Sequence, residues 1–194
     1  MTGDETWVSH ITPESKQKSL HWKHTGSPKR KKFKQTFSTR KIMCTVFWDR
    51  QGVLLVEFLP QGTTITSAVY CETLKKMYAI QNKRRGMLSA TILLLHDNAR
   101  LHAAAQTQDL ITSFMWEQKD HSPYSPDLTP SDFHLFLYLK KFLGGKRFDH
   151  DDDLKDAVQK WLTLQAAAFC EQGIQKLVPR YDKCLDNGGE YVEK

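Results

Sequence analysis

The apolar residues of this chain change their spacing from one region to the next, and this spacing predicts secondary structure. Lys41–Trp48 and Val53–Leu59 are rich in β-branched and aromatic residues and flank Asp49–Gly52, which is typical of a hairpin. Apolar residues three and four positions apart instead predict helices. We expect strands near residues 6–11, 41–48, 53–59, 90–95 and 114–117, and helices at about 67–86, after His102, from Ser131, from Asp151 and from Ala166, the last broken at Pro179.

The order of these elements predicts an α/β fold. Three strands joined without helices favour an antiparallel meander, and later strands that alternate with helices favour parallel additions. The expected architecture is a ribonuclease H-like mixed five-stranded sheet with flanking helices and extra C-terminal helices. We assign residues 1–194 to a single domain, with an insertion at about 13–40 and a C-terminal helical part at about 150–190.

The run Ala90–Leu95 ends abruptly in a polar cluster that begins with His96 and Asp97. A short run without polar alternation is typical of a strand buried on both faces. In open α/β sheets, ligands bind just beyond the carboxyl ends of such strands. Two interpretations stay open: Asp97 is a functional carboxylate, or Asp97 and Asn98 form a strand-to-helix turn, in which Asn98 caps the next helix.

Two further carboxylates can join Asp97. Asp4 lies at the first strand and Asp132 at the start of a later helix, with 34 residues between Asp97 and Asp132. Three converging aspartates repel one another unless a cation is present, and carboxylates suit Mg²⁺ or Mn²⁺, two of which can serve reactions at a phosphodiester. Each aspartate also has a simpler explanation, as a terminal, turn or first-turn helix residue, and Asp127 competes for the third position.

Charge is unevenly distributed along the chain. The net charge is +6, yet residues 16–41 hold ten Lys or Arg and no Asp or Glu, whereas residues 149–194 hold ten acidic and six basic residues. The basic segment is interpreted as a solvated loop, a phosphate-contacting segment or a nuclear-targeting segment. We expect no membrane span and no signal peptide. The four cysteines lack CxxC spacing, which indicates reduced thiols in an intracellular protein.

Three sequence blocks resemble the catalytic domain of mariner-type transposases: TGDETW (Thr2–Trp7), HDNAR (His96–Arg100) followed by His102, and YSPDLTPSDFHLF (Tyr124–Phe136). The resemblance implies that Asp4, Asp97 and Asp132 are the catalytic and metal-binding triad, with two Mg²⁺ or Mn²⁺ ions. It also implies that Glu5, His96, Asn98, Arg100 and His102 support the site or contact the DNA backbone.

The resemblance further assigns residues 13–40 to a clamp loop that reaches the partner subunit of a DNA-bound homodimer, with Lys29, Arg30, Lys31, Lys32 and Lys34 near DNA. The expected partners are therefore DNA and a second copy, with no small-molecule substrate, and the expected location is the nucleus. Family members carry helix-turn-helix units before this domain. We expect a truncated copy whose first strand is shortened before Asp4, leaving its neighbours partly unpaired and weakening stability and activity.

The expected function is that of a metal-dependent DNA endonuclease and strand transferase of a mariner-type element. One alternative is a catalytically silent DNA-binding or dimerising module derived from such an enzyme. Another is a cellular DNA-repair nuclease, which would share the same site.

Overall fold

A computed structural model describes residues 1–14, 20, 24, 26, 40–83 and 91–192. Its centre is an antiparallel sheet of β1 (Thr2–Ser9), β2 (Lys41–Asp49) and β3 (Gly52–Phe58), with β2 in the middle. A second, parallel pair consists of β4 (Leu93–Leu94) and β5 (Glu117–Gln118). One parallel bridge, Thr2 to Leu95, links the two groups. The mixed strand arrangement is as expected, but a single continuous five-stranded sheet is not formed by the described residues.

The first strand begins earlier than residues 6–11, so Asp4 lies inside it. Every residue of β1 pairs with β2, from Thr2 opposite Trp48 to Ser9 opposite Lys41. The expectation that β2 would lack partners is therefore wrong. Gly3 is required here, because a Cβ at this position would lie 2.3 Å from the Phe47 ring. The start of β1 is polar and has a weak β pattern. Backbone pairing with β2 and the close contact at Gly3 explain why it is nevertheless a strand.

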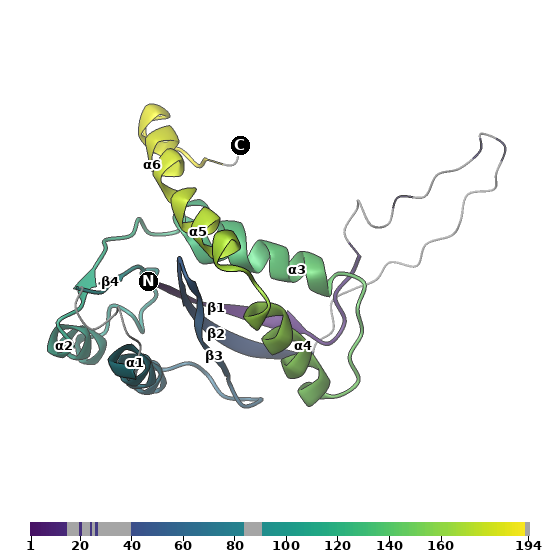
Figure 1. Ribbon diagram of the computed structural model, residues 1–194, viewed down its shortest axis with the longest axis horizontal. Helices are drawn as coiled ribbons and strands as arrows, with labels where there is room; N and C mark the ends of the chain where they lie inside the picture. Colours follow the sequence, from purple (N-terminus) through teal and green to yellow (C-terminus); the bar gives the residue numbers. More distant parts are fainter. Residues whose placement is uncertain (15–19, 21–23, 25, 27–39, 84–90, 193–194) are drawn as a thin grey trace.

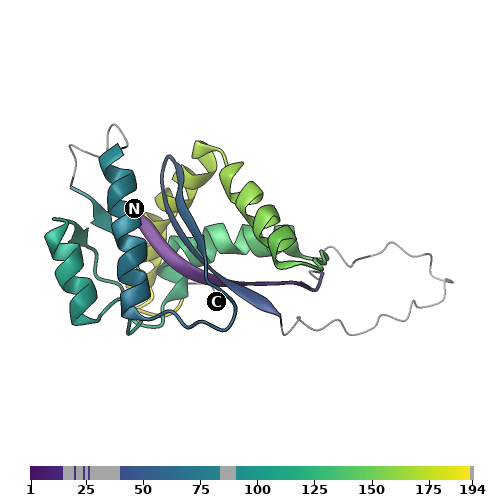
Figure 2. The same ribbon diagram turned by 90° about the horizontal axis from the view of Figure 1, so that it is seen from below.

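Helices cover both faces of the sheet, as Figures 1 and 2 show. On one face, α1 (Ser67–Lys83) and α2 (Ala105–Ser113) pack around Phe47, Leu74 and Met77. The buried residues Tyr70, Leu74 and Met77 confirm the predicted stripe of α1. The strand before α2 is not buried on both faces, since Leu93 is 49% exposed between buried neighbours.

The other face is covered by helices from the C-terminal half. They are η2 (Ser131–Phe136), which has π-helical geometry, α3 (Leu137–Leu143), α4 (Asp151–Thr163) and α5 (Ala167–Gln175). The prediction that Ser131 caps this region is wrong: Pro130 occupies the cap position, and the Ser131 hydroxyl instead accepts a hydrogen bond from Trp48 Nε1 at 3.0 Å. This bond ties the start of η2 to the sheet.

The last helical region breaks at Lys176 rather than at Pro179. Pro179 lies in the first turn of α6 (Leu177–Asp186), where a missing N–H costs no helical hydrogen bond. The short turn η1 (Pro126–Leu128) precedes η2. None of the helices among the described residues could span a membrane. The four cysteines are free thiols, and three of them are buried.

The basic residues Lys29, Arg30, Lys31, Lys32 and Lys34 lie outside the described residues, so the clamp-loop prediction stays a prediction.

Candidate active site

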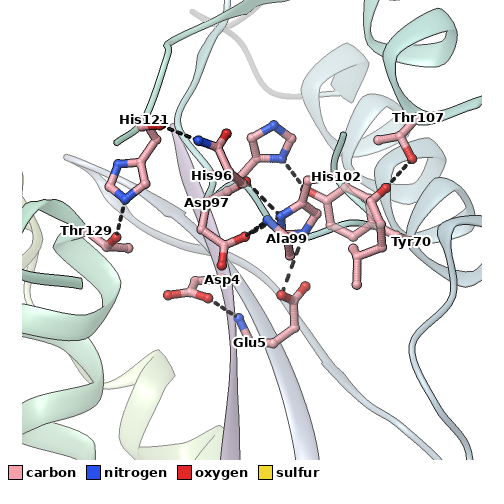
Figure 3. A network of polar contacts seen from close by, with 12 residues as sticks. Asp4, Glu5, Tyr70, His96, Asp97, Ala99, His102, Thr107, His121 and Thr129 are labelled. Atoms are coloured by element: carbon pink, nitrogen blue, oxygen red, sulfur yellow. Dashed lines mark hydrogen bonds and ion pairs between the residues drawn. The ribbon is translucent and has the colours of Figure 1, made fainter. Parts of the chain in front are cut away.

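The three predicted aspartates come from three different elements of the fold. Asp4 is on β1, Asp97 directly follows the segment that bridges to β1, and Asp132 is in the first turn of η2. Figure 3 shows the carboxylates of Asp4 and Asp97 in the same region. The negative charges of Asp132 and Asp97 both act on Asp4, which places all three within electrostatic reach.

Asp4 is a buried carboxyl with an elevated proton affinity. Its side chain is 8% exposed, and its Oδ1 accepts the backbone N–H of Glu5 at 2.7 Å. Burial, followed by the charges of Asp132 and Glu5, raises the pKa of Asp4 well above its ordinary value. A buried carboxylate surrounded by other acids is unfavourable without a cation, so this position favours positive charge.

Asp97 is partly exposed, and its charge already has a partner. His102 Nδ1 lies 2.6 Å from Asp97 Oδ1, which also accepts the backbone N–H of Ala99 at 3.0 Å. The hydrogen bond from His102 is the main reason that the pKa of Asp97 is lowered. The bond to Ala99 is an Asx turn, which confirms the turn-forming interpretation of Asp97, while its functional role stays a prediction.

His102 is a buried cation between two carboxylates. Its Nε2 lies 3.7 Å from Glu5 Oε2, on the side opposite Asp97. Burial alone lowers its pKa, but the hydrogen bond to Asp97 and the negative charges of Glu5 and Asp97 outweigh burial and raise the pKa of His102 to about 9. At neutral pH the imidazolium therefore balances part of the negative charge of the site.

A ring stack supports His102 from the helical side. Its imidazole lies 4.3 Å from the ring of Tyr70 and 4.6 Å from the ring of His96, measured between centroids. The Tyr70 hydroxyl is hydrogen bonded to His96 Nδ1 at 2.9 Å. Burial, with His102 nearby, lowers the pKa of His96 to about 3, so His96 is neutral. Figure 3 shows this stack behind Asp97. His96 is buried and packs against His102 and Tyr70, so its predicted role in supporting the site stays a prediction.

Asp132 faces two hollows. A cavity of about 380 Å³ joins Asp97 and Asp132 and is also lined by Asn98, Arg100, His121 and Tyr124. A larger groove of about 1040 Å³ runs from Asp132 and Glu5 along the outer edge of β1 and α3, past Trp7, Lys41 and Lys140. Burial and the charge of Asp97 raise the pKa of Asp132 despite the opposing effect of Lys140.

Asn98 and Arg100 lie at the mouth of the smaller cavity. The Asn98 amide donates to the backbone carbonyl of His121, and the cap position of α2 is Ala104, so the capping role proposed for Asn98 is wrong. His121 is in turn hydrogen bonded to Thr129 at 3.2 Å. These contacts join the loop after β4 to the loop before η2. Asp132 lies in η2.

The donor set suits a hard divalent cation, although ligation requires rearrangement. Three carboxylates provide oxygen ligands, and two of them have raised pKa values caused by burial and mutual repulsion. Within the described ranges, however, no three His, Cys, Asp or Glu side chains are arranged as a metal-binding cluster. Asp97 points to His102 instead.

Two site residues were missed by the sequence analysis. Tyr70 was assigned only to the helical core stripe, because helical spacing does not reveal that its hydroxyl reaches His96. His121 stands in a loop without any ligand spacing, and nothing in the sequence connects it with Asn98 or Thr129. Both roles depend on contacts between distant segments.

Comparisons with known proteins identify the family of the chain. The family described as "Transposase (partial DDE domain)" matches residues 12–90. Over 196 residues the chain is 34% identical to the mariner Mos1 transposase of Drosophila mauritiana, covering 100% of this chain and 56% of the relative. The chain thus spans about half the length of that relative.

Solved structures give the same result. The Mos1 transposase paired-end complex with left transposon end is 33% identical, with a TM-score of 0.88 over 99% of this chain and 56% of the related one. The Mos1 transposase catalytic domain, solved with Raltegravir and Mn, is 30% identical, with a TM-score of 0.80 over 98% of this chain and 82% of the related one. The chain belongs to the mariner transposase family and corresponds to its catalytic domain.

Proposed function

We propose that this chain cuts phosphodiester bonds at the ends of a mariner-type element and joins the freed 3′-hydroxyl to target DNA. The observation that supports this most strongly is that Asp4, Asp97 and Asp132 lie within electrostatic reach of one another, and that Asp4 is buried and repelled by other acids. Family membership gives the reaction, and the Mos1 catalytic domain was solved with Mn.

In this proposal the three aspartates would hold two Mg²⁺ or Mn²⁺ ions, which would supply Lewis-acid activation of the attacking oxygen and charge stabilisation of the leaving oxygen. Asp4 provides a fixed, buried ligand on the rigid strand β1. Asp132 provides a ligand beside both hollows. His102 and the Ala99 N–H hold Asp97 ionised and release it when it turns to the cation. Ser131, bonded to Trp48, keeps the start of η2 in place.

The larger groove is the proposed path for DNA. It carries Lys140, whose charge acts on Asp132. Its lining also includes Lys41, whose ammonium lies 4.1 Å from the centre of the exposed Trp7 ring. Cations attract phosphates, and an exposed aromatic ring can stack on a base. The paired-end complex of Mos1 supports a homodimer on DNA, and action on chromosomal DNA supports a nuclear location.

The basic loop around Pro28–Lys34 is proposed to contact DNA near the partner subunit. Replacing Lys29, Arg30, Lys31, Lys32 and Lys34 with serine should flatten the salt dependence of DNA binding, because each phosphate contact releases counterions. An unchanged slope of log affinity against log salt would remove the loop from the DNA path.

A catalytically silent DNA-binding module is the second candidate. It is favoured by one observation, the engagement of Asp97 with His102 in place of a ready metal cluster among the described residues. Nicking of supercoiled plasmid in Mg²⁺ or Mn²⁺ separates the two functions. We expect metal-dependent nicking by the unmodified chain and by the control Asp109→Ala, an exposed acid on α2. Asp97→Ala should reduce it by roughly a thousandfold or more. Equal rates for all three proteins would reject the proposed enzyme.

A further inference from the structure

The strongest feature outside the triad is Asp127, which the sequence analysis considered as a rival third acid. Its side chain is 2% exposed. Its Oδ2 accepts the backbone N–H of Val192 at 2.8 Å, a residue 65 positions away. The Asp127 side chain is therefore bonded to Val192 and is not counted as the third acid of the triad. Its carboxylate is instead hydrogen bonded to the C-terminal segment. Burying a carboxylate is unfavourable unless it has such a partner.

Helix α6 completes this connection. Arg180 Nη1 donates to the backbone carbonyl of Asp127 at 2.9 Å, and the guanidinium lies 4.1 Å from the centre of the Phe133 ring. Lys183 Nζ donates to the backbone carbonyl of Val192 at 2.9 Å. Figure 1 shows the chain turning back after α6. Arg180 thus contacts residues on both sides of Asp132, while Lys183 holds the tail that binds Asp127.

Apolar burial does not explain the position of α6. None of its residues is buried, and Val178 and Leu185 are 65% and 75% exposed. Polar contacts with the loop before η2 must therefore contribute much of its attachment. The segment that they hold includes η2, whose π-helical geometry is uncommon and occurs often at functional sites.

We propose that α6 and residues 187–192 form a C-terminal latch that positions Asp132 for metal binding, with Asp127 as its central positioning residue. The latch rests on the proposed function of the triad. It acts through η1 and η2: Asp127 fixes the segment before Asp132, and Arg180 against Phe133 fixes the segment after it. Opening the latch frees Asp132 to move relative to Asp4, which is held on β1.

Two pairs of variants test the latch. Val192→Pro removes the N–H that Asp127 accepts but keeps an apolar side chain, whereas Val192→Ala keeps the N–H and reduces packing. Asp127→Ala removes the acceptor, whereas Asp127→Asn keeps an oxygen that can accept the same bond. The latch predicts that Val192→Pro and Asp127→Ala weaken Mn²⁺ affinity about tenfold each, the typical value of a hydrogen bond to a charged group. The matched controls should change it less than threefold.

The double variant Asp127→Ala with Val192→Pro should bind Mn²⁺ no more weakly than either single variant. The reason is that both substitutions remove the same hydrogen bond. Hydrogen exchange without metal should become about tenfold faster at residues 126–136 in Val192→Pro and stay unchanged in β1. Faster exchange confined to residues 187–192, or an equal loss of Mn²⁺ affinity in Val192→Ala, would overturn the latch. If the unmodified chain neither binds Mn²⁺ nor nicks DNA, the proposed function fails, and the exchange comparison still decides whether the latch holds η2.

Discussion

Asp4 and Asp97 are two acids of one site with opposite electrostatic environments. Asp4 is buried on a paired strand, and burial together with nearby acids raises its pKa. Asp97 is partly exposed on a loop, and the hydrogen bond from His102 lowers its pKa. On the strand side, ionised Asp4 would have no cation to balance it, while the loop side contains its own cation.

This difference shows how a protein can hold acids together before a metal binds. The repulsion that destabilises Asp4 is the same energy that a divalent cation recovers on binding. His102 keeps Asp97 ionised and near the site in the meantime. A divalent cation at this site would add positive charge beside Asp4, which has no cationic partner of its own.

The largest expected effect comes from replacing the two acids separately. Asp4→Asn and Asp97→Asn should each reduce metal-dependent nicking by about a thousandfold or more. Their stabilities without metal should move in opposite directions: Asp4→Asn should melt higher, because it removes a buried charge, and Asp97→Asn should melt lower, because His102 loses its partner. Thermal melting in chelator checks this. Shifts of the same sign would show that the two environments do not differ as described.

The pH dependence of stability should report His102. Its pKa is raised in the folded state to about 9, so its contribution to stability is present below the unfolded value of about 6.5 and is lost as the pH rises through about 9. In the Asp4→Asn background, which removes the titration of Asp4, the free energy of unfolding should fall by about 2–3 kcal/mol across this range. Urea unfolding from pH 6 to 9.5 measures it.

The control for that experiment is His102→Gln in the same background, which has no titrating group at this position. Its stability should be lower at pH 6 and should approach that of its parent above pH 9. If both proteins lose the same free energy across the range, then His102 is not the charged partner of Asp97.

A smaller effect is expected on the Asp132 side. Ser131→Ala removes the acceptor of the buried Trp48 N–H and should lower the free energy of unfolding by about 1–2 kcal/mol. Ser113→Ala is a suitable control, since its exposed hydroxyl bonds only to the backbone of its own helix. Chemical unfolding of both variants checks this. Equal stability for the two would mean that the bond does not hold η2 on the sheet.

Element order follows from local patterns and was predictable from the sequence. Helical spacing predicted Tyr70, Leu74 and Met77 as one buried stripe, and the apolar run before Asp97 predicted a strand beside the site. The first strand was placed too late because Thr2–Thr6 gain their stability from pairing with β2, which no local propensity records. The contact of His121 with Thr129 and that of Asp127 with Val192 could not be predicted for the same reason. Both depend on contacts that no local pattern records.

The most direct measurement is the shift in melting temperature that millimolar Mn²⁺ produces. A cation that binds only the folded state raises stability by mass action. The account predicts a clear rise for the unmodified chain and for Asp109→Asn, and little or none for Asp4→Asn, Asp97→Asn and Asp132→Asn. An equal rise in all five proteins would contradict it, because the metal would then bind somewhere other than the three aspartates.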